Sequence, residues 1–270
     1  MGDLKVVSRE YKVALHYAPF AGDEGRVLQA ASTFWEQTGQ ALVGVVDLDG
    51  SFSEVKERRL IRFYDTPSKD VYAADYIFRE RVDHAGEREV TLKFRHRDRY
   101  VAQDRDMGTK PGADDVKTKF EEDIKAPFLV LYSYSTTQGI TPTRTLDSMK
   151  DVYRLYPGTS EKLEQPEDAA IEVVRAFTAR ELVLAGAELE LGRSNDVKAE
   201  CALIVWYDDG APAESESPVF VEFSFKYGDA DEDFGGGPAR RAYDTLDVLH
   251  GLTDWVDPNS RTKTAFVYGS

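Results

Sequence analysis

Hydrophobic and polar residues alternate with a period of two along most of the chain, which is the pattern of half-buried β-strands. The alternation predicts strands at residues 6–17, 41–47, 58–64, 76–82, 89–97, 116–124, 171–184, 187–192, 198–207 and 219–227. Helical spacing is rarer and predicts helices at residues 24–38, 126–134, 146–156 and 238–250. Many antiparallel strands with few helices predict an α+β domain built on a large sheet or a closed barrel.

The polar faces of these strands are charged rather than mixed. Lys93 and Arg95 share one face of their strand, and Arg79 and Arg81 share one face of the preceding strand. Like charges on neighbouring strands repel each other, so four clustered cations need a compensating anion. A barrel with charges pointing inward and helices packed outside meets this need and makes a polyanion site. The alternative is a sheet whose charged face is simply solvated.

Composition narrows the class of protein. The 270 residues include 34 Lys and Arg against 49 Asp and Glu, for a net charge of −15, and 41% are hydrophobic. The acidic balance argues against general nucleic-acid binding. No apolar run reaches the ~18–20 residues of a membrane span, so no membrane partner is expected. The single cysteine, Cys201, excludes an internal disulfide, and with no secretory signal we expect a cytoplasmic protein. The pattern leaves the oligomeric state open.

Several short motifs occur in a fixed order. Residues 62–67 read Arg-Phe-Tyr-Asp-Thr-Pro, residues 78–81 read Phe-Arg-Glu-Arg and residues 91–95 read Thr-Leu-Lys-Phe-Arg. Residues 8–12 read Ser-Arg-Glu-Tyr-Lys, and residues 220–226 read Phe-Val-Glu-Phe-Ser-Phe-Lys. A closing segment runs from Ser-Arg-Thr-Lys at 260–263 to Tyr268. Together these stretches resemble the CYTH, or triphosphate tunnel metalloenzyme, superfamily, and the resemblance covers most of the chain.

The resemblance implies one domain over residues 1–270, with a helical insertion around 126–165. Its fold would be an antiparallel eight-stranded β-tunnel, a closed barrel with helices packed outside. Members bind a triphosphate with one or two divalent cations, here Mg²⁺ or Mn²⁺. They hydrolyse inorganic triphosphate, thiamine triphosphate or nucleoside triphosphates, cyclise ATP, or cap RNA.

Matching the motifs residue by residue assigns candidate site residues. The implied phosphate ligands are Lys12, Arg62, Arg79, Arg81, Lys93, Arg95, Lys119, Arg175 and Lys226. The implied metal ligands are Glu10, Glu121, Asp123 and Glu222. Asp123 would orient or activate water, and Lys93 would be the second catalytic residue. Ser8 and Ser224 stand where the family has glutamates, which lowers the charge available to a metal.

The resulting hypothesis is metal-dependent hydrolysis of inorganic triphosphate or of an organic triphosphate inside a cation-lined tunnel. One alternative is a catalytically weak or inactive module that binds polyphosphate or a nucleotide. A further alternative is a class IV-type adenylyl cyclase. In each case the partner is a small-molecule triphosphate or polyphosphate.

Overall fold

The computed structural model describes residues 4–125, 128–192, 197–210, 217–258 and 261–269. Its strands are β1 (Ser8–Leu15), β2 (Asp47–Gly50), β3 (Val55–Asp65), β4 (Tyr76–Asp83), β5 (Arg88–His96), β6 (Asp114–Lys125), β7 (Leu129–Ile140), β8 (Glu172–Glu190), β9 (Lys198–Asp208) and β10 (Phe220–Gly228). Nine of these described strands close a barrel in the order β8-β3-β4-β5-β7-β6-β1-β10-β9, with β9 pairing back onto β8. The remaining described strand, β2, pairs with the second half of β8.

The barrel differs in two ways from the expected eight antiparallel strands. It has nine strands within the described residues, and β1 runs parallel to β6. The additional strand is β7, which begins within the range 126–134 where hydrophobic spacing predicts a helix. That helix prediction is wrong for residues 129–134, and residues 126–127 lie outside the described part of the chain.

The physical reason lies in the residues that follow the apolar run. A short apolar stretch does not by itself distinguish a buried helix from a buried strand. Residues 132–137 read Tyr-Ser-Tyr-Ser-Thr-Thr, a composition that favours a pleated strand. Tyr134 pairs with Phe94 of β5 on one side and with Phe120 of β6 on the other. The strand therefore fills the gap between β5 and β6, and the helical part of the expected insertion is limited to α4 (Met149–Leu155) and α5 (Ser160–Leu163).

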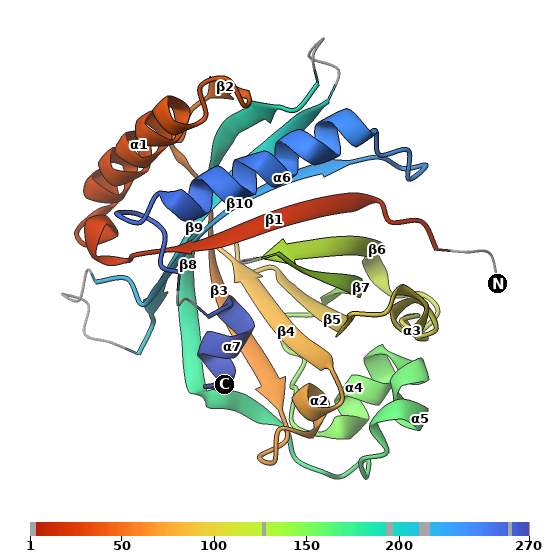
Figure 1. Ribbon diagram of the computed structural model, residues 1–270. Coiled ribbons are helices and arrows are strands. Elements are labelled where there is room, and N and C mark those ends of the chain that lie inside the picture. Colours follow the sequence, from red (N-terminus) through yellow and green to blue (C-terminus); the bar gives the residue numbers. More distant parts are fainter. Residues whose placement is uncertain (1–3, 126–127, 193–196, 211–216, 259–260, 270) are drawn as a thin grey trace.

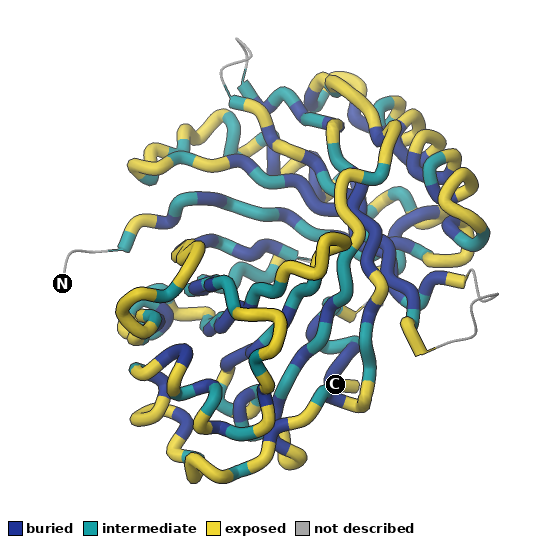
Figure 2. Tube along the Cα trace, turned by 180° about the vertical axis from the view of Figure 1, so that it is seen from behind, coloured by how far each residue is buried: buried dark blue, intermediate teal, exposed yellow. Residues whose placement is uncertain are grey.

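Helices cover the outside of the barrel on two sides (Figure 1). The long helices α1 (Glu24–Ala41) and α6 (Gly236–Gly251) lie over β1, β9 and β10, as the spacing at 24–38 and 238–250 predicts. Their core includes edge-to-face contacts of Phe34 with Phe223 and Trp255, at ring-centroid distances of 5.2 and 5.5 Å. A second core packs α3 (Arg99–Gln103), α4 and α5 against β4 to β7. Figure 2 shows the consequence, with buried and intermediate residues prevailing along the strands, and exposed residues in the loops and on one side of the helices.

Two short helices lie at one end of the barrel. These are α2 (Asp70–Ala73), directly after β3, and α7 (Lys263–Tyr268), near the C-terminus. The chain also forms the 3-10 turns η1 (Ala18–Phe20) and η2 (Pro157–Thr159). A third apolar cluster, which includes Phe63, Trp206 and Tyr268, packs between α7 and the strand ends. Among the described residues, no helix is both long and apolar enough to span a membrane.

Candidate functional site, a cation-lined tunnel

The barrel encloses a cavity of about 600 Å³ to which all nine of its described strands contribute side chains. Eleven lysine and arginine residues line it, against seven aspartate and glutamate residues, an excess of four positive charges. The whole chain carries −15, so the lining has the opposite sign to the protein around it. This arrangement follows from the strand pattern, because apolar residues alternate outward to the helices and charged residues alternate inward.

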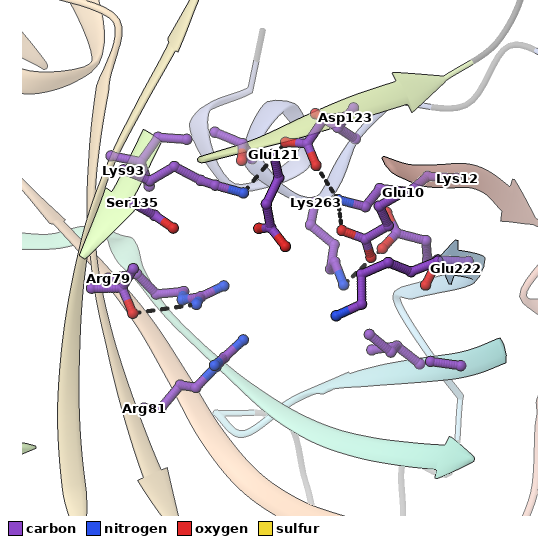
Figure 3. Close-up of a pocket in the computed structure, with 18 of the residues that line it drawn as sticks. Glu10, Lys12, Arg79, Arg81, Lys93, Glu121, Asp123, Ser135, Glu222 and Lys263 are labelled. Atoms are coloured by element: carbon purple, nitrogen blue, oxygen red, sulfur yellow. Dashed lines mark hydrogen bonds and ion pairs between the residues drawn. The ribbon is translucent and has the colours of Figure 1, made fainter. Parts of the chain in front are cut away.

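Most of the sequence-predicted site residues lie together in this cavity. The lining contains Glu10, Lys12, Arg79, Arg81, Lys93, Arg95, Lys119, Glu121, Asp123, Glu222 and Lys226. Figure 3 shows the guanidinium groups of Arg79 and Arg81 on the side of the cavity opposite Glu10, Lys12 and Glu222.

Arg62 and Arg175, both predicted phosphate ligands, do not line the cavity. Phe63 points inward, so its neighbour Arg62 points out of the barrel, where it donates to Glu80 and Thr178 at 3.2 Å each. Arg175 lies in an irregular part of β8 with a φ of 55°, and its Nη1 donates to the Phe266 carbonyl at 3.2 Å. Both arginines therefore stabilise the outside of the barrel rather than its interior.

Asp123 is surrounded by cations. Its carboxylate accepts from Lys12 at 2.9 Å, from Arg95 at 2.9 Å and from Lys93 at 3.3 Å. Burial works against ionisation, but Lys12, Lys93 and Arg95 together hold the pKa of Asp123 well below its ordinary value. Burial outweighs the attraction of Asp123 for Lys93 and lowers the pKa of that lysine to about 8. We call Asp123 with these three cations the paired cluster.

Arg79 is the opposite case. Its Nη2 makes a long contact of 3.5 Å to the Thr91 hydroxyl, and its buried Nε has no hydrogen-bond partner among the described residues. Burial, and next the neighbouring guanidinium of Arg81, hold the pKa of Arg79 well below the ordinary arginine value. Arg81 itself donates to Glu89 at 3.0 Å. Arg79 is thus an inward-facing cation without a carboxylate partner in the described structure.

Glu121 and Lys263 are two further charged residues of the lining. Glu121 accepts from the Ser8 hydroxyl at 2.6 Å, and Figure 3 shows its side chain projecting from β6 into the cavity. Lys263 belongs to α7 and reaches Glu222 at 2.8 Å. Sequence reasoning does not identify Lys263, nor Arg59, Glu89 and Glu181, as site residues. Arg59 had a usable signal, because it alternates in step with the inward-facing Phe63, whereas Lys263 reaches the site only through the tertiary fold.

Three of the four carboxylates expected to bind a divalent cation are already paired with lysine or arginine in the described structure, an arrangement that does not fit a metal site. Among the described residues, no three His, Cys, Asp or Glu side chains gather closely enough to hold one. Glu10 pairs with Lys12 at 2.8 Å, Asp123 belongs to the paired cluster, and Glu222 pairs with Lys263. A hard cation needs several oxygen ligands whose negative charge is available to it. The expectation of Mg²⁺ or Mn²⁺ therefore stays a prediction.

No protein-family model and no curated protein matches the chain. Among solved structures, it is similar to HpAC1 of Hippeastrum, a candidate adenylyl cyclase described as having a dominant triphosphatase activity. That similarity has 12% identity, 98% and 97% coverage of the two chains and a TM-score of 0.45. A candidate adenylate cyclase of Bacillus halodurans has 11% identity, 98% and 99% coverage and a TM-score of 0.41. One of Vibrio parahaemolyticus has 12% identity, 97% and 98% coverage and a TM-score of 0.34. Likenesses at this level do not assign a function to the chain.

Proposed function

We propose that the tunnel binds the triphosphate group of a small molecule, or a short inorganic polyphosphate, and hydrolyses its terminal phosphoanhydride bond. The observation that carries the proposal is Arg79, whose inward-facing guanidinium has no carboxylate partner among the described residues. Arg79 is half-buried, and a charge partly removed from water without an opposite charge beside it is unfavourable, so its retention supports an anionic ligand that compensates it. Guanidinium groups bind phosphate oxygens through two parallel hydrogen bonds.

The size and charge of the cavity favour a compact ligand. A volume of about 600 Å³ lies within the range of small-molecule sites. Since the chain carries −15 and the lining +4, all other positions together carry −19. Such an exterior repels nucleic acid, while the local field of the lining attracts a small polyanion into the barrel.

In the proposed reaction, water attacks the terminal phosphorus and the bond from that phosphorus to the bridging oxygen breaks. Arg79, Arg81 and Arg95 would neutralise the charge on the phosphate oxygens, since catalysis of this kind is mostly positioning and electrostatics. We assign the proton acceptor for water to Glu121, because the three cations around Asp123 make that carboxylate a poor base. Lys93, with a pKa of about 8, would donate a proton to the leaving oxygen.

The test measures binding and turnover separately. Isothermal titration with tripolyphosphate measures binding, and phosphate release from tripolyphosphate, ATP and thiamine triphosphate in Mg²⁺, Mn²⁺ or EDTA measures hydrolysis. Release well above background supports a triphosphatase and identifies its substrate. Binding without release supports the non-catalytic module instead, and cyclic AMP formed from ATP supports a cyclase. Failure of tripolyphosphate to bind in any of the three conditions overturns the proposal.

A further inference from the structure

Lys263 enters the barrel from outside its wall. It is the first residue of α7, and its ammonium lies 2.8 Å from the Glu222 carboxylate of β10. The same ammonium lies 5.8 Å from the ring centre of Trp206, a cation–π distance. Its side chain is 22% exposed and Glu222 is 5% exposed, so water screens this ion pair weakly.

Helix α7 is held firmly enough to keep Lys263 in place. At its far end the Tyr268 hydroxyl donates to Asp65 at 3.1 Å, and the Tyr268 ring stacks on Tyr72 at 4.1 Å. Lys69 donates to the Tyr268 carbonyl at 2.8 Å. Near its first turn, Arg95 of the paired cluster donates to the Thr264 hydroxyl at 3.4 Å. The helix is therefore attached both to the barrel end and to the site.

Asp65 is the centre of this attachment. Its carboxylate accepts backbone N–H groups of Thr66, Val71 and Tyr72 at 2.8–2.9 Å, in addition to the Tyr268 hydroxyl. These four hydrogen bonds satisfy the buried Asp65 carboxylate without a cationic partner. They fix the turn before α2 and hold the Tyr268 side chain at the end of α7. The turn after β3 thus helps to position Lys263, although Asp65 and Tyr268 are 203 positions apart in the sequence.

The charges around Glu222 leave no role for a second cation there. Glu222 already has Lys263, and the other inward carboxylates nearest in the sheet, Glu10 and Asp123, already share Lys12. The neutral hydroxyl of Ser224 is the next inward-facing group along β10. A lysine ammonium thus lies against one oxygen of this carboxylate, and a metal bound to Glu222 would compete with it.

We propose that Lys263 acts as a built-in cation, so that the tunnel binds a triphosphate through side-chain charges alone and needs no divalent metal. The inference rests on the triphosphate-binding function proposed above. When the ligand enters, the Lys263 ammonium donates to its phosphate oxygens while Glu222 holds the lysine in place. Removal of Lys263 leaves Glu222 unpaired, which creates a carboxylate able to recruit a divalent cation to the bound ligand.

The experiment compares tripolyphosphate affinity in EDTA and in Mg²⁺ for the wild-type chain and four variants. For the wild type we expect equal affinity in both buffers, after correction for Mg²⁺ bound to free tripolyphosphate. Lys263→Gln should bind about 10- to 100-fold more weakly in EDTA, since one charge-assisted contact is lost, and Mg²⁺ should restore part of that loss. Lys263→Gln combined with Glu222→Gln should lose the response to Mg²⁺. Lys150→Gln, which removes an exposed lysine paired with Glu167 at 3.8 Å, is the matched control and should behave as the wild type.

The outcomes separate the inference from the function on which it rests. Wild-type binding in Mg²⁺ with none in EDTA overturns the role of Lys263 and leaves triphosphate binding intact. Affinity of Lys263→Gln in EDTA equal to that of the wild type also overturns it. Failure of the wild type to bind tripolyphosphate in either buffer overturns the proposed function itself. Thermal unfolding of each variant shows whether it is folded. Lys263→Arg keeps the positive charge, so it should retain binding in EDTA if the glutamine variants lose binding for electrostatic reasons.

Discussion

Replacement of Arg79 by methionine should stabilise the free protein and weaken its ligand binding at the same time. The unpaired guanidinium has a lowered pKa because burial and Arg81 disfavour its charged form in the fold. Arginine is charged in the unfolded chain at any ordinary pH, so this cost applies over the whole range from about pH 5 to pH 9. Methionine has a similar length and removes the charge.

The expected magnitudes follow from the position of the side chain. Replacing a buried charge by an apolar side chain is typically neutral or stabilising by about 1–4 kcal/mol. We expect about 1–2 kcal/mol here, because only the Nε of Arg79 is fully buried without a partner. For a chain of this size each kcal/mol raises Tm by about 2–4 °C. Loss of charge-assisted contacts to phosphate should weaken tripolyphosphate binding by about 10- to 100-fold.

The assay is thermal unfolding with and without tripolyphosphate. Ligand at a hundred times its Kd adds about 2.7 kcal/mol to the stability of the wild type and much less to that of the variant. Ligand should therefore narrow the difference between the two melting temperatures, and an affinity loss of about 100-fold should reverse their order, with the variant higher when free and the wild type higher when bound. The stability difference between the free proteins should be the same at pH 6 and pH 8, because arginine does not titrate there.

The matched control is Arg62→Met on the adjacent strand β3. Arg62 faces out of the barrel and pairs at 3.2 Å with Glu80, whose side chain is 0% exposed. Its loss leaves a buried carboxylate with one partner fewer, so we expect destabilisation by about 1–3 kcal/mol with unchanged tripolyphosphate affinity. If Arg79→Met instead lowers stability by several kcal/mol and binds tripolyphosphate as the wild type does, Arg79 is a structural residue and the reasoning is refuted.

Three further substitutions test the remaining roles. Because the pKa of Lys93 is about 8, its ammonium loses charge as the pH rises through that value. The tripolyphosphate affinity of the wild type, measured by titration calorimetry relative to Lys93→Arg, should therefore fall between roughly pH 7 and pH 9. Glu121→Gln should lower kcat for phosphate release by about 10²- to 10⁴-fold with little change in Kd, and equal kcat would remove Glu121 from the mechanism. Asp123→Asn should destabilise the fold by about 3–5 kcal/mol in urea unfolding, because three cations lose their shared carboxylate. A small effect would mean that the paired cluster contributes little to stability.

The wall that carries the cations was predictable from the sequence because strands have a strict period of two. In β4 and β5 that period places Arg79, Arg81, Lys93 and Arg95 on one face, and a shift by one residue would expose Phe78 and Leu92 instead. The structure has all four cations in the cavity. Local alternation with one apolar face thus determines which side chains point inward, even when the partner strands are unknown.

The same rule identifies what could not be predicted. Phe63 lines the cavity and packs in the same apolar cluster as Tyr268 of α7. Strand alternation therefore points the neighbouring Arg62 outward, whereas motif matching assigned Arg62 to the interior. Lys263 meets Glu222 only because α7 folds back onto the barrel end through Tyr268. The strand β7 has an apolar beginning that fits either a helix or a strand. Each of these features depends on a contact between distant parts of the chain, about which a local pattern carries no information.

The lining combines two electrostatic arrangements that serve one ligand in different ways. In the paired cluster Asp123 holds Lys12, Lys93 and Arg95 at hydrogen-bonding distance, so these cations keep their positions when the cavity contains only water. The cluster itself has three positive charges against one negative charge. The rest of the excess charge resides in Arg79 and in cavity lysines without an ion-pair partner within the described chain, such as Lys119. The cations of the paired cluster are held in place and lose little entropy on binding, whereas the unpaired ones attract the anion at the expense of stability in the free protein. Under the proposed function, a triphosphate would be drawn in by the unpaired cations and aligned by those that Asp123 holds in place, which gives this buried carboxylate a role in an otherwise cationic wall.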